Sequence, residues 1–389
     1  MTAPAAESPS PPPLPALARA FVERFAQPPV PFELDLPQGR RIAIGRGTPQ
    51  FHIIARNGRG MRALSTLDAG RFGDAYVAGD LDLEGDMLAP FALRGSMGDA
   101  HPLLAIWRFV EPMLVGQVRT NRRAIARHYD IDPAFFLAFL DPDVPCYTQG
   151  VYASDDESLA TATRRKLAWC FDQCGLEAGD RMLEVGPGWG AWFEYASQRG
   201  VHCTGITNSP VSIGYLTQRA RSLGHDWTLI EDDFLHHRSH EKYDAIVIMG
   251  VIEHLPQYER VLAKVASMLR PGGTLFVDAS ACTRKYQLSS YMVKYIYGGN
   301  HSFLVLHEFL AALARTPLEL MALENDRHSY FLTFRQWAMN FDAHRDAVIE
   351  RFGEFDYRRF RLYLWGAAYE FASRSLDSYR MIIRNTASP

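Results

Sequence analysis

The sequence predicts an α/β protein in which a small α+β domain precedes an open parallel sheet with helices on both faces. From about Asp180, short apolar segments alternate with helical segments, which is typical of such a sheet. Earlier in the chain, short alternating segments are broken by Gly and Pro turns. We expect a disordered tail over residues 1–13, an α+β domain over 14–120, and the larger domain over 121–389.

Composition and charge limit the classes of function. Of the 389 residues, 47% are hydrophobic and 22% are charged, as in ordinary soluble globular proteins. The formal net charge of -3 gives no global basic field for nucleic acid. No apolar run approaches the roughly 20 residues that span a bilayer, and residues 1–13 lack the pattern of a secretion signal. We therefore expect a cytoplasmic protein.

Neither the cysteines nor the histidines predict a metal site. The five cysteines lack metal-ligand spacing, so we interpret them as reduced thiols. Three histidines at positions 236, 237 and 240 lie in a polar segment with no fixed helical face, which favours a solvated loop. The expected metal content is none.

The first domain is predicted to contain one helix and three short strands. Leu14–Phe25 has an amphipathic helical pattern, and the strands are expected at Phe32–Leu36, Arg41–Ile44 and Phe51–Ala55. The acidic run Asp80–Asp86 lacks the spacing of a calcium-binding loop, so we interpret it as a solvated turn.

The second domain is predicted to alternate five strands with three helices. The strands are expected at Arg181–Val185, Val201–Thr207, Trp227–Ile230, Tyr243–Met249 and Gly273–Asp278. The helices are expected at Ala191–Gly200, Pro210–Leu223 and Tyr258–Leu269. The chain beyond Ser289 is mostly helical and aromatic, which suits a cap over the ligand edge of the sheet.

A glycine-rich segment, Glu184–Gly190, follows the first strand of this domain and precedes a helix. Glycines at 186, 188 and 190 allow a tight turn and a close approach of backbone to ligand. Open α/β sheets bind ligands at the carboxyl ends of their strands. This spacing alone is weak, because dinucleotide-binding proteins use it as well.

Further residues favour S-adenosylmethionine over a dinucleotide. Glu184 ends the first strand; Asp232 and Asp233, followed by Phe234, end the third, where they could hold an adenine amino group and cover its ring. The fourth strand ends at Gly250, facing the transferred methyl group.

The second strand ends without an acidic residue. A dehydrogenase is therefore disfavoured, because such enzymes hold the ribose with an acid there. Thr207 or Asn208 is expected to hold the ribose instead.

Ordered motifs along the chain resemble the cyclopropane fatty acid synthase family, which includes the mycolic acid cyclopropane synthases. The segments that carry the resemblance are His128–Pro142, Tyr147–Tyr152, Leu159–Lys166, Leu183–Gly190, Met249–Leu255, Lys294–Tyr297, Tyr330–Trp337, Phe360–Leu364 and Tyr379–Met381. The resemblance covers nearly the whole chain and is strongest from His128 onward.

The resemblance implies the Rossmann-like fold of class I S-adenosylmethionine-dependent methyltransferases, with a helical lipid-binding cap. It also implies methylation of a cis double bond in a phospholipid acyl chain, followed by proton loss that closes a cyclopropane ring. Tyr147 and Thr148 fall at the cofactor site of the family. Four aromatic residues, Tyr147, Trp189, Tyr295 and Tyr330, are candidates to face the carbocation. Taken singly, each is more typical of a core residue, and the family motifs favour the functional role for Tyr147 and Tyr330.

The family's base, a bound bicarbonate, is held by residues that this chain keeps only in part. Glu253 and Tyr330 match, whereas Asp278 stands in place of a His, Ser280 of an Ile and Gln149 of a Cys. A second carboxylate beside Glu253 would repel bicarbonate, so bicarbonate is a doubtful ligand here, and two close carboxylates would tend to share a proton.

Our hypothesis is that Asp278 or Glu253 itself is the base, or that no ring closes and the product is methyl-branched or methylene-bearing. His254 follows Glu253 in the matching motif, so it is either catalytic or bonded to backbone at a helix start.

Two other functions stay open. One is a small-molecule N-methyltransferase of the coclaurine type, which the first domain argues against. The other is a non-catalytic lipid-binding relative, which the intact glycine segment, Asp233, Glu253 and Tyr330 argue against.

A phospholipid substrate implies a peripheral position at the inner membrane surface. The basic stretch Gln117–Arg127 could contact anionic headgroups there or form a solvated helix face. Family members are often dimers, and the sequence leaves a homodimer open.

Overall fold

The computed structural model describes residues 15–99, 132–285, 288–297 and 301–387. Internal contacts divide the chain into two units, Met1–Ala100 and His101–Pro389. The predicted tail, the predicted domain boundary at residue 120, the basic stretch 117–127 and the start of the first family motif all lie outside the described residues. Those expectations stay predictions, and each unit is described by itself.

The first unit is a small mixed sheet with helices. Its described strands form a sheet in the order β2-β1-β3-β4, in which β1 and β3 are parallel and the other neighbours antiparallel. The strands are β1 (Phe32–Asp35), β2 (Arg41–Ile44), β3 (Phe51–Ala55) and β4 (Leu81–Gly85). The helices are α1 (Ala16–Arg24), α2 (Gly58–Ser65), α3 (Ala69–Val77) and a 3-10 helix (Ala89–Ser96). The predicted first helix and three strands are confirmed to within two residues.

The interpretation of Asp80–Asp86 as a solvated turn is wrong, because most of this run is strand β4. Leu81 and Leu83 are buried, and they alternate with acidic residues that point the other way. Asp80 is itself buried and accepts hydrogen bonds from Asn57 Nδ2 at 2.7 Å and Arg59 Nε at 3.1 Å. The alternating leucines therefore indicate a strand here, and the high content of acidic residues was a misleading sign of a turn.

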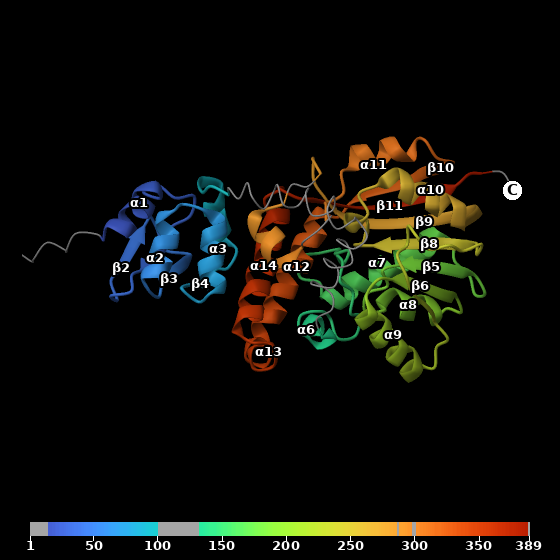
Figure 1. Cartoon of the computed structure of the whole chain (residues 1–389), viewed down its shortest axis with the longest axis horizontal. Helices are drawn as coiled ribbons and strands as arrows, with labels where there is room; N and C mark the ends of the chain where they lie inside the picture. The colour runs from blue at the N-terminus through green and yellow to red at the C-terminus, as the bar shows by residue number, and fades with distance from the viewer. Residues whose placement is uncertain (1–14, 100–131, 286–287, 298–300, 388–389) are drawn as a thin grey trace, which may run out of the picture. The chain divides into compact units, whose positions relative to one another are not determined.

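The second unit contains a sheet of seven described strands in the order β10-β11-β9-β8-β5-β6-β7 (Figure 1). The strands are β5 (Arg181–Val185), β6 (His202–Thr207), β7 (Thr228–Glu231), β8 (Tyr243–Met249), β9 (Leu269–Ala281), β10 (Leu318–Asn325) and β11 (Asp377–Asn385). From β7 to β9 all neighbours are parallel, which confirms the predicted α/β pattern. The expectation of a purely parallel sheet needs correction, because β11 runs antiparallel to both β9 and β10.

Alternation along the strands places helices on both faces of this sheet. Ile246 and Ile248 of β8 belong to a core cluster with residues of α10 and α11. Ala245 and Val247 of the same strand belong to a second cluster with residues of α7, α8 and α9. The helices are α7 (Leu159–Cys174), α8 (Ala191–Ser197), α9 (Pro210–Leu223), α10 (Tyr258–Met268) and α11 (Leu306–Leu313).

A helical cap, α12 to α14, follows β10. The helices are α12 (Arg327–Ala343), α13 (Arg345–Phe352) and α14 (Glu354–Ala372), and α12 and α14 lie side by side (Figure 1). They pack through aromatic rings, among them Tyr330 and Phe371, whose ring centroids are 4.6 Å apart. The short helix α6 (Pro133–Leu137) contacts the cap through Phe136, whose ring centroid lies 6.0 Å from that of Phe360 in α14. The helical, aromatic character predicted beyond Ser289 is therefore confirmed.

Candidate functional site

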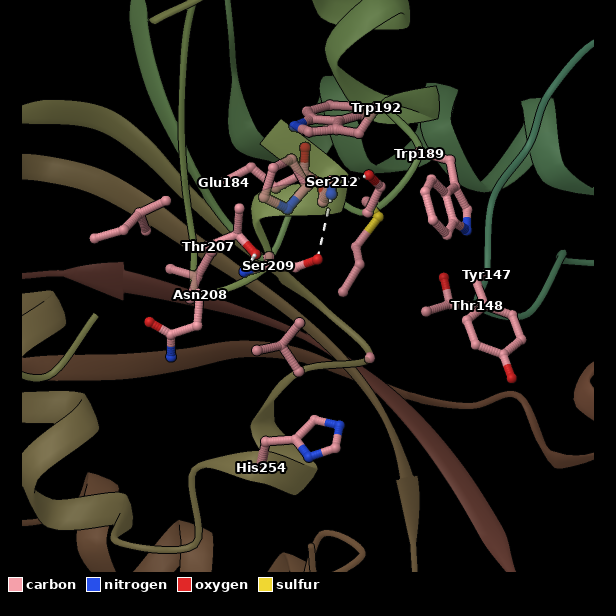
Figure 2. Close-up of a pocket in the computed structure, with 18 of the residues that line it drawn as sticks. Tyr147, Thr148, Glu184, Trp189, Trp192, Thr207, Asn208, Ser209, Ser212 and His254 are labelled. Carbon is pink, nitrogen blue, oxygen red and sulfur yellow. Dashed lines mark hydrogen bonds between the residues drawn. The ribbon is translucent and has the colours of Figure 1, made fainter. Parts of the chain in front are cut away.

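A pocket opens at the carboxyl ends of β5, β6, β7 and β8, where the strand order reverses between β5 and β8 (Figure 2). Gly190 is the one predicted cofactor residue that does not line it. The other ten do: Tyr147, Thr148, Glu184, Gly186, Gly188, Thr207, Asn208, Asp233, Phe234 and Gly250. Residues predicted from separate local patterns, after four different strands and at Tyr147 and Thr148, thus line one pocket.

Two glycines fix the backbone around the pocket. Gly186 has φ of 72°, and a Cβ there would lie 2.5 Å from Val251 Cγ2. Gly250 has φ of 63°, and a Cβ there would lie 2.5 Å from Thr148 Cγ2. Positive φ disfavours other residues, and the contacts leave no space for a side chain. The loops after β5 and β8 therefore require glycine for two independent reasons.

Glu184 supplies a buried acceptor at the pocket wall. Its side chain is 3% exposed, and Oε2 receives no hydrogen bond from the described residues. Burial raises the pKa of Glu184 well above its usual value. A hydrogen-bond donor on a bound ligand would satisfy this oxygen, so the residue fits a cofactor that carries ammonium and hydroxyl groups.

The acidic pair after β7 shapes the adjoining loop. Asp233 Oδ1 accepts hydrogen bonds from the backbone N–H groups of Leu235 and His236, at 2.9 and 3.2 Å. His236 and His237 pair through Nδ1 with Asp233 and Asp232, respectively. Among the described residues, no group of three or more His, Cys, Asp or Glu side chains could hold a metal ion.

The predicted catalytic residues separate into two places. His254 lines the pocket, whereas Glu253, Asp278 and Tyr330 are buried and are not among the residues that line it. Glu253 Oε1 accepts a hydrogen bond from Ser280 N at 2.8 Å. Glu253 Oε2 is buried and receives none from the described residues.

Burial controls the protonation of these side chains. Burial raises the pKa of Glu253 to about 8 and lowers that of His254 to about 4, so His254 is neutral at physiological pH. Burial, together with the nearby Glu253 and Asp278 carboxyl groups, raises the pKa of Tyr330 well above its usual value, so its hydroxyl stays protonated.

Asp278 does not pair with Glu253 as the sequence suggested. Its side chain alternates with Ala279 along β9 and therefore lies on the face covered by α7, where Lys166 Nζ contacts Asp278 Oδ2 at 3.1 Å. Thr148 Oγ1 donates to the same oxygen at 3.3 Å. Different donors hold the two carboxyl groups, so they do not share a proton through a direct contact, although burial and the nearby Asp278 both raise the pKa of Glu253. An ion-paired Asp278 does not fit the role of a free base.

Lys166 was missed as a site residue, although the sequence contains a signal for it. In α7, Thr163, Lys166, Leu167 and Cys170 all lie on the buried face at helical spacing. A lysine within an apolar stripe requires a buried partner, since an unpaired buried charge is costly. The signal predicts an acidic partner without identifying it.

Aromatic rings from separate elements meet beside the pocket. The Phe136 ring of α6 lies 5.4 Å from that of Tyr147 and 5.2 Å from that of Trp189, and both of these residues line the pocket. The Tyr147 ring also lies 5.3 Å from that of Trp337 in α12. Tyr295 lies outside this group, because it packs against Tyr291 and Phe355. The cap and the pocket thus share an aromatic wall.

Comparisons with known proteins agree with this architecture. A sphingolipid C9-methyltransferase of Komagataella phaffii is 26% identical over 341 residues, covering 80% of this chain and 69% of that protein. A probable fatty acid methyltransferase of Pseudomonas putida is 25% identical over 370 residues, covering 91% of each chain. The structure of the mycolic acid cyclopropane synthase CmaA1, complexed with SAH and CTAB, matches with a TM-score of 0.63 at 21% identity, over 68% of this chain and 98% of that one.

The family comparison covers most of the second unit. The family model described as mycolic acid cyclopropane synthetase matches residues 117–381, which is more than half of the chain. This match begins before the described part of the second unit and ends within β11. The chain therefore belongs to the mycolic acid cyclopropane synthetase family, and its second unit is a methyltransferase domain with the class I, S-adenosylmethionine-dependent fold.

Proposed function

We propose that this enzyme transfers a methyl group from S-adenosyl-L-methionine to the cis double bond of an unsaturated acyl chain in a phospholipid. One observation carries the proposal: an aromatic wall shared with the cap borders the cofactor pocket, and the buried carboxyl group of Glu253, next in sequence to the pocket residue His254, has one oxygen without a described donor. Methylation of an alkene needs these parts together, namely a methyl donor, an apolar surface and a proton acceptor. A polar amine substrate needs no such wall.

S-Adenosyl-L-methionine is the cofactor, and the pocket residues fit its groups. Its sulfonium supplies an electrophilic methyl group. Glu184 offers a buried acceptor to an ammonium or hydroxyl donor. Thr207 and Asn208 lie at the end of β6, where a ribose would be held, and Phe234 offers an apolar surface near the adenine position.

The aromatic wall suits the cation that methyl transfer creates. The double bond's electron pair forms the new carbon–carbon bond, the sulfonium keeps the electrons of the broken carbon–sulfur bond, and a neighbouring acyl carbon becomes cationic. The faces of Tyr147 and Trp189 can stabilise that charge by about 0.5–2 kcal/mol each. The same rings exclude water, which would otherwise quench the cation.

Glu253 is the best-placed proton acceptor in this proposal. Its Oε1 is committed to Ser280 N, and Oε2 is left to take a proton. A pKa of about 8 lies close to physiological pH, as suits a general base. Loss of a proton from the added methyl group closes a cyclopropane ring. If a hydride shift first moves the charge to the carbon that carries the new methyl group, loss of a methyl proton gives a methylene group, and loss of a proton from the acyl chain gives a methyl-branched alkene. We assign no role to bicarbonate, because Glu253 already occupies the backbone N–H of Ser280.

The substrate places the enzyme at a membrane surface in this proposal, since phospholipid acyl chains lie in the bilayer. Among the described residues, no helix is long and apolar enough to cross a membrane. We propose peripheral binding at the inner membrane surface, and the undescribed basic stretch at 117–127 is a candidate for headgroup contact. A homodimer stays a prediction.

The test is mass spectrometry of lipids from a host that expresses the chain and is fed methionine with a CD3 methyl group. A gain of one labelled carbon on unsaturated acyl chains, absent with the G186A variant, is the expected result. Two retained deuterium atoms indicate proton loss from the methyl group, and three indicate a methyl branch. Fragmentation then separates a ring from a methylene group.

Two outcomes would contradict the proposal. If the purified protein binds S-adenosyl-L-methionine but no lipid carries label, then the small-molecule methyltransferase becomes the better assignment. A protein that fails to bind the cofactor would instead support a non-catalytic lipid-binding relative.

A further inference from the structure

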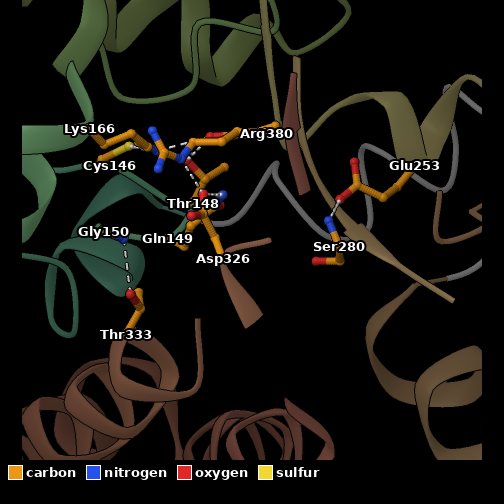
Figure 3. A network of polar contacts seen from close by, with 11 residues as sticks. Cys146, Thr148, Gln149, Gly150, Lys166, Glu253, Ser280, Asp326, Thr333 and Arg380 are labelled. Atoms are coloured by element: carbon orange, nitrogen blue, oxygen red, sulfur yellow. Dashed lines mark hydrogen bonds and ion pairs between the residues drawn. The ribbon is translucent and has the colours of Figure 1, made fainter. Parts of the chain in front are cut away.

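The segment Tyr147–Gly150 is tied to other elements at three consecutive residues (Figure 3). Thr148 contacts the Lys166–Asp278 ion pair. Gln149 Nε2 donates to Asp326 Oδ2 at 3.3 Å, and Gly150 N donates to Thr333 Oγ1 at 3.0 Å. We call Tyr147–Gly150 the pocket segment, because Tyr147 and Thr148 line the cofactor pocket. The pocket segment therefore contacts α7, β9 and the start and first half of α12.

The ion pair beneath Thr148 is completely buried. Lys166 Nζ donates to Asp278 Oδ2 at 3.1 Å, to Cys146 Sγ at 3.4 Å and to Thr148 Oγ1. Both charged side chains have no solvent exposure. These bonds use all three donors of the ammonium group. Burial disfavours the charge, but Asp278 outweighs it and raises the pKa of Lys166 above its usual value, so the ammonium group stays charged.

Asp278 holds two neighbouring residues that line the pocket, Thr148 and Gly250. Its side chain accepts from Thr148 Oγ1, and its backbone carbonyl accepts from Gly250 N at 3.1 Å. Thr148 and Gly250 both line the pocket, and they are so close that a Cβ on Gly250 would meet the Thr148 methyl group. A shift of Asp278 would therefore move two pocket residues at once.

We propose that Lys166 and Asp278 are positioning residues for the methyl donor: their ion pair holds Thr148 against Gly250 and so sets the shape of the cofactor pocket. The proposal rests on the proposed function, because it takes this pocket to be the S-adenosyl-L-methionine site. It gives Asp278 a role through Thr148, and no proton transfer is required of it.

A second buried ion pair provides a matched control. Arg380 Nε donates to Asp326 Oδ2 at 2.7 Å, and both side chains are less than 10% exposed. This pair contacts the pocket segment one residue further along, at Gln149, which does not line the pocket. Breaking it should disturb the protein to a similar extent but should leave the cofactor contacts in place.

The experiment compares four variants of the full chain by calorimetric titration with S-adenosyl-L-methionine and by thermal unfolding. We expect cofactor binding to weaken by about tenfold or more in K166M, in T148V and in the double variant K166M/D278N. Each of these variants removes hydrogen bonds that position the Thr148 side chain. R380M is expected to stay within about threefold of the wild type at a comparable loss of Tm. In lipid methylation assays, K166M should raise KM for the cofactor and leave KM for the lipid unchanged.

The outcomes separate the two proposals. A wild-type protein that binds no S-adenosyl-L-methionine overturns the proposed function. Wild-type binding with equal weakening in K166M and R380M overturns the positioning role and leaves the function standing. If K166M does not fold, K166M/D278N decides, because removing both charges leaves no unpaired buried ion. Wild-type affinity in that double variant also overturns the role.

Discussion

The backbone N–H of Ser280 donates a hydrogen bond to Glu253 Oε1 at 2.8 Å, which joins the 3-10 helix Ile252–His254 after β8 to strand β9. The backbone of Glu253 is held as well, because its carbonyl accepts from Ser302 N at 2.8 Å. The carboxyl group is thus fixed through one oxygen, and the second oxygen receives no donor from the described residues. A group held in this way can exchange a proton without losing its position.

Methyl transfer should depend on pH through Glu253. Its pKa of about 8 means that the carboxylate, the form that accepts a proton, predominates only above that pH. We expect the rate to rise between pH 6 and pH 9 with a midpoint near 8, and E253Q to be slower by about 100-fold or more without that rise. The measurement is the initial rate of label transfer into vesicles with cis-unsaturated chains. A flat wild-type profile would contradict the role.

Cofactor binding should release protons from Glu184. Burial raises the pKa of this carboxyl group, and a donor on the ligand favours the ionised form, so binding should lower the pKa and strengthen as pH rises. Titration calorimetry in buffers of different ionisation enthalpy measures the protons released. E184Q should abolish the release. The control E194Q removes a carboxylate of α8 that pairs with Arg219, and it should leave the proton release unchanged. Equal release by E184Q and wild type would show that the protons do not come from Glu184.

Alanine at Gly250 should abolish cofactor binding. Its φ is 63°, and the new Cβ would lie 2.5 Å from Thr148 Cγ2, so the pocket must shift. G224A is the control: φ is 69° there, and no atom lies within 4 Å of the new Cβ. That variant should lose about 1 kcal/mol of stability and bind normally. Equal binding by both variants would show that the contact with Thr148 is unimportant.

Removing the hydroxyl of Tyr330 should slow methyl transfer more than it lowers stability. The residue is buried on α12, and the neighbouring carboxyl groups that affect its pKa place it near Glu253. We expect Y330F to be about tenfold slower, by loss of one hydrogen-bonding group near Glu253. The control Y357F removes a bond to Asp342 Oδ1 at 2.9 Å and should affect only thermal stability. Wild-type turnover by Y330F would remove Tyr330 from the mechanism.

Local signals made part of the fold predictable. Helix α9 begins and ends where the sequence predicts, because Ser209 caps it, Pro210 is its first residue and Gly224 adopts the left-handed conformation after its end. Strand β10 was not predicted. It is an edge strand with Met321 and Leu323 exposed, so it has no clean alternation of buried and exposed residues.

In the site, too, contiguous motifs were predictable from the sequence, whereas contacts between residues far apart in the chain were not. The glycine segment Glu184–Gly190 is contiguous, so its residue types alone indicated a ligand loop. Lys166 and Asp278 are 112 residues apart, and their pairing depends on α7 covering the face of β9 to which Asp278 points. Family motifs aligned Asp278 with a position near Glu253, but alignment does not report which donor each carboxyl group meets.

Strand β11 lies between β9 and β10, although it follows β10 in the chain. During synthesis from the N-terminus, β10 therefore emerges before the strand that it needs as its partner. We expect the backbone N–H and C=O groups of β10 to stay without a strand partner until β11 is synthesised, so that other chains can reach them. Arg380, which holds Asp326 and through it Gln149, also arrives with β11. The order of translation thus makes the completed pocket segment one of the last parts of this domain to form.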